Sequence, residues 1–442
     1  RGSAGGSFCP EALRSRGKCG GRGGSIEAFQ GFRAFGQLEA NMRKRWADFL
    51  ILAAALASAA SFSASAAQWS TNSTGQQIYV NDNGSTVTNS WIKADSDGAT
   101  IWYYAGADGT LRKDGWQRVG EDYYYFDASG KMQTGWVDNY MYYCDPQSGA
   151  MKTGWRELPL PDALTADGKA KGGSYWFYFS TKDGEKFHAG SSETVTKTID
   201  GPVYGFDENG VMVTGWAETE STSPDIAGYM YFSEKATGSL KLGQRIAGTW
   251  YAAVGPNKED GSGNVEWFYL KSNGHPAAGS ADIYDVQRIN GKRYLFNDKG
   301  NPVYGIQRGK SAEDGPDSYY YCGSSKNDCS VKTGKMTLTQ DNGERISCYF
   351  ESSGKGLTGV RDNSLYYNGK LQKAEKDIRY QKATLPNGST YVVNENGRIM
   401  KNRKNYKDGN GIKWTSDASG KLVQDEGLEA LELSSPEITD LS

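Results

Sequence analysis

Histidine is scarce in this sequence: the 442 residues include only two, His188 and His275. Neither lies beside a recognisable nucleophile, so the sequence offers no Ser–His–Asp or Cys–His arrangement for nucleophilic catalysis. The cysteines and histidines match no zinc-ligand spacing. The Asp- and Asn-rich turns at 81–84 and 95–98 lack the distal glutamate of a calcium-binding EF-hand. We therefore expect no metal, no cofactor and no catalytic site, and we expect both histidines to lie in solvated loops.

Long hydrophobic runs are also nearly absent. The apolar run at 49–60 is too short to span a membrane comfortably. It follows the basic residues 43–45 and precedes small residues at 64–67, the order typical of a secretory signal peptide. We predict a signal peptide over 42–67, with a retained membrane anchor as the alternative. Residues 1–41, which begin with arginine, are expected to be upstream sequence outside the fold.

Clustered positive charge is missing from the rest of the chain. Nine of the 50 Lys and Arg residues and four of the 52 Asp and Glu residues fall in 1–67, which leaves the remainder with a net charge of about −7. Phosphate contacts need clustered Lys and Arg, so nucleic acid is disfavoured as a partner. A secreted, acidic protein is predicted.

Four cysteines follow the predicted signal peptide. An exported chain permits disulfides, and a bridge between Cys322 and Cys329 across the base of a hairpin loop is one interpretation. The other follows from aligning the sequence repeats, which places Cys144 and Cys322 where Phe126 stands. On that interpretation the cysteines are small core residues.

Tyrosine, tryptophan and glycine are abundant, with 28, 12 and 57 residues, and they recur at a fixed spacing. Trp116, Trp136 and Trp155 each follow a glycine and lie 20 and 19 residues apart. A period this short cannot build an independent domain. It predicts small units that stack and share a core.

Each unit has the pattern of a β-hairpin. Tyr124 and Phe126 alternate with Tyr123 and Tyr125, which is the period of a strand. A turn of the form Asp/Asn-x-x-Gly follows, closed by the side chain of its first residue and the left-handed backbone of its glycine. An isolated hairpin is marginal in water, so stacking must supply the missing burial. The turn recurs at 127–130, 207–210, 297–300 and 394–397.

The pattern predicts an all-β solenoid of tandem β-hairpins over residues 90–424. It is most regular over 90–155, and loops lengthen the later units. Residues 68–89 are expected to form a polar leader. Residues 425–442 are expected to form an acidic, disordered tail.

The run from Gly115 to Trp136 closely resembles the cell-wall-binding repeat of the choline-binding family. Related repeats occur in streptococcal glucan-binding proteins and in the receptor-binding ends of clostridial toxins. The resemblance implies a β-hairpin solenoid that binds ligands between consecutive hairpins. Aromatic side chains would cage a quaternary ammonium, because their faces carry negative potential, or would stack on sugar rings.

Carried onto this sequence, the resemblance implies a first cage of Trp116, Tyr123 and Tyr143 and a second cage of Trp136 with Trp155. Met141 stands where Tyr123 stands one repeat earlier, so the second cage lacks a wall. Each of these aromatics has core packing between hairpins as its alternative role.

The resulting hypothesis is a secreted, non-catalytic protein of the cell surface. It would attach non-covalently to choline-bearing teichoic acid or another wall polymer. The alternatives are a glycan-binding adhesin that recognises glucan or host carbohydrate, and an accessory part of a wall hydrolase. The repeats leave no room for a catalytic domain between residues 90 and 424.

Overall fold

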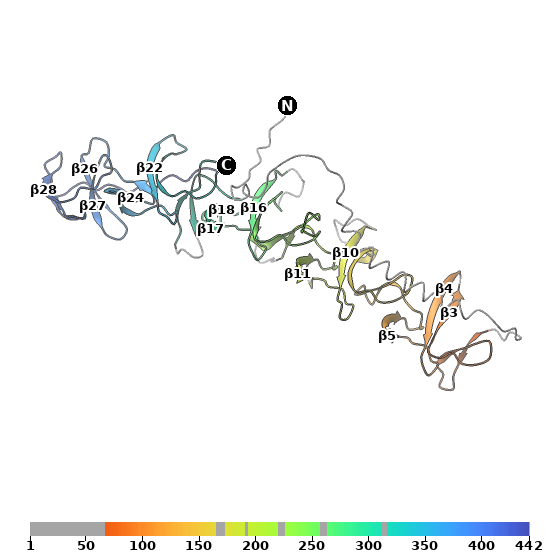
Figure 1. Ribbon diagram of the computed structural model, residues 1–442. Helices are drawn as coiled ribbons and strands as arrows, with labels where there is room; N and C mark the ends of the chain where they lie inside the picture. The colour runs from red at the N-terminus through yellow and green to blue at the C-terminus, as the bar shows by residue number, and fades with distance from the viewer. Residues whose placement is uncertain are drawn as a thin grey trace, which may run out of the picture. The chain divides into compact units, whose positions relative to one another are not determined.

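The computed structural model describes residues 67–441 except 97, 165–172, 191–192, 220–225, 257–262 and 311–315. Over these residues the chain consists of β-strands and two 3-10 helices, η2 (Asp162–Leu164) and η3 (Ile226–Gly228), without an α-helix (Figure 1). The predicted all-β fold of tandem β-hairpins is confirmed. The predictions of an upstream segment and a signal peptide concern residues outside this range, apart from residue 67.

The described chain forms two compact units, residues 67–187 and 188–441. The first unit is a series of antiparallel hairpins. They are β1 (Gln68–Thr71) with β2 (Gln77–Val80), β3 (Ser90–Ser96) with β4 (Ala99–Ala105), β5 (Gly115–Val119) with β6 (Asp122–Phe126), β7 (Gly135–Val137) with β8 (Tyr142–Cys144), and β9 (Gly154–Pro159) with β10 (Ser174–Phe179). The segment expected to be a polar leader therefore contains a hairpin, and Trp69 of β1 packs on Tyr79 of β2 with ring centroids 4.9 Å apart.

The second unit begins with further hairpins and then adds larger sheets. The hairpins are β11 (Val195–Thr198) with β12 (Val203–Phe206), β13 (Gly215–Glu218) with β14 (Tyr229–Phe232), β15 (Thr249–Ala253) with β16 (Glu266–Leu270), and β26 (Tyr380–Thr384) with β27 (Thr390–Asn394). The four-stranded sheet has the order β18 (Lys292–Phe296), β17 (Tyr284–Ile289), β19 (Ile306–Lys310), β20 (Ser318–Tyr321). The five-stranded sheet has the order β21 (Gly334–Thr339), β22 (Arg345–Phe350), β25 (Lys370–Leu371), β24 (Ser364–Tyr367), β23 (Gly359–Arg361). The three-stranded sheet has the order β28 (Arg403–Lys407), β29 (Lys413–Ser416), β30 (Leu422–Asp425).

The turn of each hairpin has the chemistry that the sequence predicts. Asp127 Oδ1 accepts hydrogen bonds from the backbone N–H groups of Ser129 (2.8 Å) and Lys131 (2.9 Å). Gly130 has a φ of 81°, a conformation that costs most other residues energy. The side chain of Asn297 accepts from Lys299 and Asn301 in the same way. These turns end one strand and start the short return segment, so the hairpin boundaries follow from local sequence.

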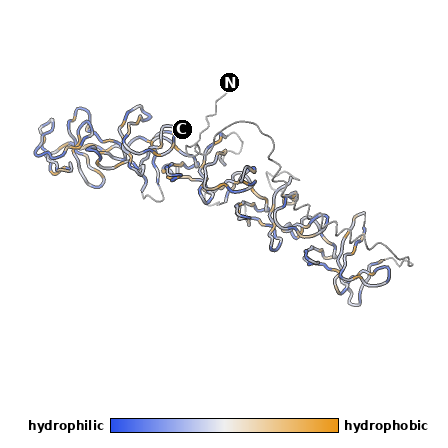
Figure 2. The backbone as a smooth tube through the Cα atoms, viewed as in Figure 1, coloured by the Kyte–Doolittle hydropathy of each residue, from blue (hydrophilic) through white to orange (hydrophobic). Residues whose placement is uncertain are grey.

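The core of each unit is thin and repeats from hairpin to hairpin. Figure 2 shows it as short hydrophobic stretches separated by longer hydrophilic segments. The last residue of a hairpin's second strand, or the residue directly after it, is fully buried in ten hairpins. These residues, all 0% exposed, are Ala105, Phe126, Cys144, Phe179, Phe206, Phe232, Leu270, Phe296, Cys322 and Phe350. Cys144, Cys322, Cys329 and Cys348 are free and buried, so the interpretation of cysteine as a small core residue is confirmed and a Cys322–Cys329 disulfide is absent.

These buried thiols are expected to be chemically inert in the folded protein. Burial raises the pKa of Cys144, Cys329 and Cys348 to about 12 and raises that of Cys322 as well. The thiolate is the reactive species, so at pH 8 reaction with a disulfide reagent should slow about a thousandfold relative to an ordinary thiol. The other two cysteines, Cys9 and Cys19, are replaced by serine for this test. Four thiols of that chain should then react with the reagent in guanidinium chloride, and almost none should react without it. Rapid labelling of the folded chain would contradict this burial.

Consecutive hairpins are joined by a methionine that packs on the next turn. A Cβ added to Gly149 would overlap Sδ of Met132, and one added to Gly184 would overlap Sδ of Met151. Gly243 and Met212 repeat the contact in the second unit. The glycine is therefore required twice, for its left-handed backbone and for the space that its missing side chain leaves.

Replacing Gly149 by alanine is expected to lower the free energy of unfolding by about 2–4 kcal/mol, from backbone strain plus overpacking. The matched control is Gly135→Ala. Gly135 has nearly the same φ (73° against 74°), but no atom lies within 4 Å of its added Cβ. The control should lose only about 1 kcal/mol in denaturant titrations. Equal losses in both variants would argue against the methionine contact.

Two predictions differ from the structure. His275 is buried rather than solvated, because it lies between the turn that ends at Gly274 and the bridge from Pro276 to Leu270. The acidic tail is ordered over 426–441 and packs on earlier hairpins, with Leu428 buried.

His188 is half-buried, with Nδ1 2.6 Å from the carbonyl oxygen of Ala189. Within the described ranges, no helix is long and apolar enough to cross a membrane.

Candidate functional site

A tryptophan on the first strand of each regular hairpin packs edge-on against the tyrosine opposite it. Antiparallel pairing places the two residues side by side on one face of the hairpin. The ring centroids of these pairs lie 5.1–5.5 Å apart: Trp91–Tyr104, Trp116–Tyr125, Trp136–Tyr143, Trp155–Tyr178, Trp216–Tyr231 and Trp250–Tyr269. The pairs fix the orientation of the indole rings.

Most of these tryptophans also contact an aromatic ring of the following hairpin. The centroid distances are 4.8–5.1 Å for Trp91–Tyr124, Trp116–Tyr142, Trp136–Phe177, Trp216–Phe268 and Trp250–Tyr294. The tryptophans therefore lie in the seams, which are the contact zones between consecutive hairpins. A tryptophan in a seam can either pack in the core between hairpins or contact a ligand.

In the described residues, no ring contact joins Trp116, Tyr123 and Tyr143, the members of the first predicted cage. Trp116 meets Tyr142 of the next hairpin at 5.0 Å, whereas Tyr143 packs on Trp136. Side chains alternate between the two faces of a strand, so the adjacent tyrosines Tyr142 and Tyr143 contact different tryptophans. Tyr123 is 44% exposed and lies opposite Arg118 in the strand register.

The second predicted cage is divided between two places. Trp136 contacts Tyr143 and Phe177, and its Nε1 donates a hydrogen bond to the carbonyl oxygen of Pro159 (3.1 Å). Trp155 instead faces Trp176. The ammonium of Lys186, a residue only 4% exposed, lies 5.4 Å from the centroid of the Trp136 ring. An internal cation thus already covers the aromatic face that an external cation would need.

Another pair of aromatic side chains lies on the β3–β4 hairpin, and it was not among the residues predicted from sequence. The indoles of Trp91 and Trp102 are nearly perpendicular (89°) with centroids 6.4 Å apart, and Trp102 is 37% exposed. Tyr124 of the next hairpin packs edge-on against Trp91 at 4.8 Å as a third wall, and it is only 9% exposed. We call these three residues the Trp91–Trp102 corner.

A signal for this corner was present in the sequence. Trp91 follows Ser90 rather than glycine, so a search for Gly-Trp passes over it. Aligning Trp102-Tyr103-Tyr104 with Tyr123-Tyr124-Tyr125 would have placed Trp102 at the exposed wall position. Trp155 and Trp176 form a second corner of similar geometry, 6.4 Å and 75°.

Charges of both signs lie near the Trp91–Trp102 corner, because Lys93 stands directly opposite Trp102 in the strand register and Asp122 interacts with Tyr124. Burial, and secondarily the Asp122 carboxylate, raise the pKa of Tyr124 to about 12, so its phenol stays neutral near pH 7. Asp122 places a negative charge near this third wall. Aromatic faces attract cations by their electrostatic potential, most strongly for tryptophan. The arrangement can hold a quaternary ammonium or support a flat sugar ring.

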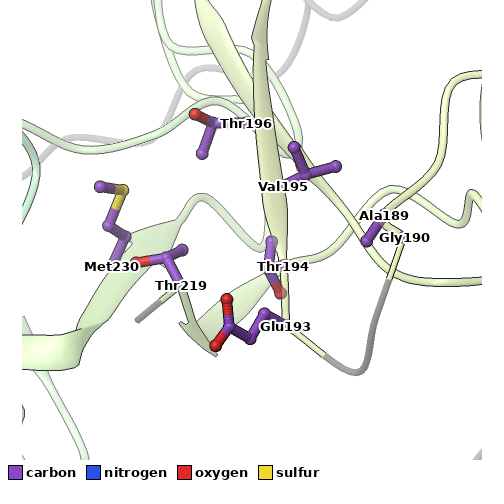
Figure 3. A pocket seen from close by; sticks show the side chains of 8 residues that line it. All are labelled: Ala189, Gly190, Glu193, Thr194, Val195, Thr196, Thr219 and Met230. Carbon is purple, nitrogen blue, oxygen red and sulfur yellow. The ribbon is translucent and has the colours of Figure 1, made fainter. Parts of the chain in front are cut away.

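A groove of a different character lies in the second unit (Figure 3). Its volume is about 390 Å³, and Figure 3 shows Met230 and Thr219 on one side and Ala189 and Gly190 on the other. Among the described residues that line it, Glu193 is the single carboxylate. Glycoside hydrolysis usually needs two carboxylates across a cleft, so this lining does not supply that chemistry.

Comparison with known proteins finds a family match within the first unit. Residues 113–154 match the family model described as a choline-binding repeat. Glucosyltransferase-S of Streptococcus downei is 29% identical over 222 residues, which are 49% of this chain and 14% of that protein. Glucosyltransferase-I of Streptococcus downei is 27% identical over 420 residues, 80% of this chain and 25% of that protein. The chain thus spans a quarter or less of the length of these relatives.

Two solved structures match this chain at lower identity. The choline-binding domain of CbpL from Streptococcus pneumoniae is 20% identical with a TM-score of 0.33, covering 54% of this chain and 98% of that chain. CbpJ of the same organism is 20% identical with a TM-score of 0.32, covering 76% and 100%. The family match confirms the resemblance that the repeat sequence indicates.

Proposed function

Because residues 113–154 match the choline-binding repeat, we propose that this chain is a secreted, non-catalytic protein of the cell surface that attaches non-covalently to choline-bearing teichoic acid of the wall. The observation that carries the proposal is the Trp91–Trp102 corner. Trp102 is 37% exposed and stands perpendicular to Trp91, on which Tyr124, only 9% exposed, also packs. A trimethylammonium gains most when several aromatic faces surround it at once, and no titratable partner is needed.

Attachment through more than one corner would strengthen binding. The first unit contains the Trp91–Trp102 corner and the Trp155–Trp176 corner. A wall polymer repeats its choline groups, so binding at one corner raises the effective concentration at the other. Such linkage increases overall affinity by roughly 10²–10⁴ without any new contact.

The test is retention of the intact chain on a choline-substituted resin, followed by elution with free choline. Retention that free choline abolishes is the expected result. A resin bearing primary amines is the control, because it presents positive charge without the trimethylammonium group. A folded chain that passes through the choline resin, or that the amine resin retains equally, would refute the choline assignment.

Glucan is a second candidate ligand, favoured by a separate observation. Trp69, Trp102 and Tyr123 are exposed aromatics of the first unit, and flat aromatic faces also stack on sugar rings. The relatives are named as glucosyltransferases, one of them aligned over 80% of this chain. Retention on immobilised glucan that free choline does not reverse would favour this ligand over choline.

A non-catalytic role is supported by what surrounds the two histidines. His275 is buried, and His188 lies 2.6 Å from a backbone carbonyl oxygen. Neither arrangement resembles a base that activates a nucleophile. Assays of glucosyl transfer and of release of wall fragments are expected to show no activity above a heat-denatured sample. Turnover in either assay would overturn this part of the proposal.

Replacing Lys186 by methionine is expected to create an additional ligand site. Lys186 occupies the position that Met132 and Met151 hold in preceding repeats, and its ammonium covers Trp136. Methionine fills nearly the same buried space, so the change removes the repelling charge, worth roughly 1–2 kcal/mol to an external cation, without uncovering the ring. Titration with choline, followed by tryptophan fluorescence, should give one more binding site per chain. The control is Lys182→Met, an exposed position of the same loop, which should leave the number of sites unchanged.

A further inference from the structure

The C-terminal segment 426–441 runs back past hairpins that lie progressively earlier in the second unit. Hydrogen bonds link Glu429 to Gln381, Ser434 to Gln372 and Thr439 to Gln307, across 48, 62 and 132 residues of sequence. Figure 1 accordingly places the C-terminal end of the chain close to β18 and away from β28. A short segment thus touches hairpins that are distant from one another in the chain.

Buried glutamines bind the main chain of this segment. The amide of Gln372 donates from Nε2 to the carbonyl oxygen of Ser434 (2.9 Å) and accepts at Oε1 from the N–H of Ser434 (3.0 Å). Oε1 of Gln340 accepts from the N–H of Glu437 (3.0 Å), and Nε2 of Gln307 donates to the carbonyl oxygen of Thr439 (2.9 Å). These glutamines are 2%, 6% and 1% exposed. Buried amides need partners, and here the partner is peptide backbone.

Strand β26 binds the start of the segment in the same manner. The N–H of Lys382 donates to the carbonyl oxygen of Glu429, and the N–H of Leu431 donates to the carbonyl oxygen of Lys382, both at 2.8 Å. The bridge is parallel, between Lys382 and Ala430. Addition of an extended segment to a sheet edge is a recurring mode of peptide recognition, in which main-chain bonds give affinity and side-chain pockets give specificity.

The side chains of the segment divide between two faces. Leu428 is buried against Tyr380 and Trp414. Leu431 and Leu433 pack on the cluster that contains Leu365, Leu385 and Val393. Glu429, Glu432 and Glu437 are exposed. From 431 to 433 this is the two-residue alternation of an extended strand, with leucine inward and acid outward.

We propose that the surface that residues 426–441 cover over the hairpins from β19 to β27, which we call the groove, is a peptide-binding site. Its ligand is an extended segment with leucine at alternate positions and acidic residues facing outward, and residues 426–441 are its resident, separable occupant. The strand pairs β19–β20, β21–β22 and β26–β27 are complete without this segment. The segment leaves β30 at Gly427, whose φ of 108° marks a turn in the backbone.

The direct test uses the full chain with Leu431→Glu and Leu433→Glu, which weakens the segment and leaves the groove unchanged. A fluorescent peptide with the native sequence of residues 426–441 should bind this variant in the micromolar range. It should bind the native chain at least tenfold more weakly, because the attached segment fills the groove at a high effective concentration. Adding Gln372→Ala to the variant should lower its peptide affinity at least tenfold, since both hydrogen bonds to Ser434 are lost. Gln424→Ala, an exposed glutamine on β30, is the control.

Hydrogen exchange supplies a second measurement that needs no disruptive variant. In a chain that carries only Gln372→Ala, the amides of Ser434 and Glu437 should exchange about tenfold faster, with that of Val392 in β27 unchanged. Absence of peptide binding by a folded double variant would overturn the proposal. Exchange of the segment and of β27 as one cooperative unit would overturn it as well, because the segment would then be an inseparable part of the fold. Neither readout depends on the wall ligand.

Discussion

Phe296→Ala is expected to lower the free energy of unfolding of the second unit by about 3–5 kcal/mol. Phe296 is fully buried, and its ring lies 5.6 Å from that of Trp250 and 6.4 Å from that of Tyr269. It belongs to a cluster with Ile289 and Cys329. Truncation leaves a cavity in the seam between β15–β16 and β17–β18, and a thin core has few other residues that can fill it.

The control is Phe296→Leu, because Leu270 fills the equivalent position one hairpin earlier and is equally buried. A leucine keeps most of the volume and should cost less than half as much as alanine. Guanidinium chloride titrations followed by tryptophan fluorescence measure both losses. A loss below about 1 kcal/mol for the alanine variant would mean that neighbouring hairpins collapse onto the site.

The effect should also stay local along the second unit. In a stack of repeats each hairpin depends mainly on its immediate neighbours. Amides of β15–β18 should exchange faster in the alanine variant, whereas those of β28–β30 should not change. Uniform acceleration across the unit would indicate that its hairpins unfold as one cooperative body.

The hairpins could be predicted from sequence because their determinants are local. The Asp127 side chain and the left-handed Gly130 lie within four residues of each other, and together they end one strand and start the next. The period of the Gly-Trp pairs then fixes how often this happens. The position of Cys144 in the core followed from the same alignment.

The candidate site depends on features that the repeat period does not fix. Tyr142 and Tyr143 are adjacent, and a change of one residue moves an aromatic ring to the other face of the strand. Because adjacent side chains point to opposite faces of the strand, the ring of Trp116 contacts Tyr142 and not Tyr143. Lys186 stands at a methionine position, and only the fold shows that its ammonium lies over Trp136.

The C-terminal segment was predicted incorrectly for a related reason. Its composition is acidic and polar, which is typical of disorder. Its stabilising partners, such as Gln372 and Ile306, lie 62 to 133 residues earlier in the chain. Composition cannot reveal partners at that distance.

Trp102→Ala is expected to lower the affinity of the Trp91–Trp102 corner for choline about two- to fivefold, or about 0.5–1 kcal/mol, the value of a cation–aromatic contact at an exposed site. The variant should carry Trp176→Ala as background, so that the second corner does not contribute. Trp102 is 37% exposed, so its loss should change the free energy of unfolding by less than about 1 kcal/mol. Calorimetric titration with choline, together with a denaturant titration, separates the two effects.

Trp69→Ala is the matched control for this prediction. Trp69 is 36% exposed, belongs to the same unit and packs on Tyr103, but it lies outside the corner. Its removal should leave choline affinity unchanged. Affinity of the native chain should also be flat between pH 6 and 9, because a quaternary ammonium does not titrate and the pKa of Tyr124 is raised to about 12. If Trp69→Ala weakens binding as much as Trp102→Ala, choline is held by a broad aromatic surface, and the perpendicular pair is not the site.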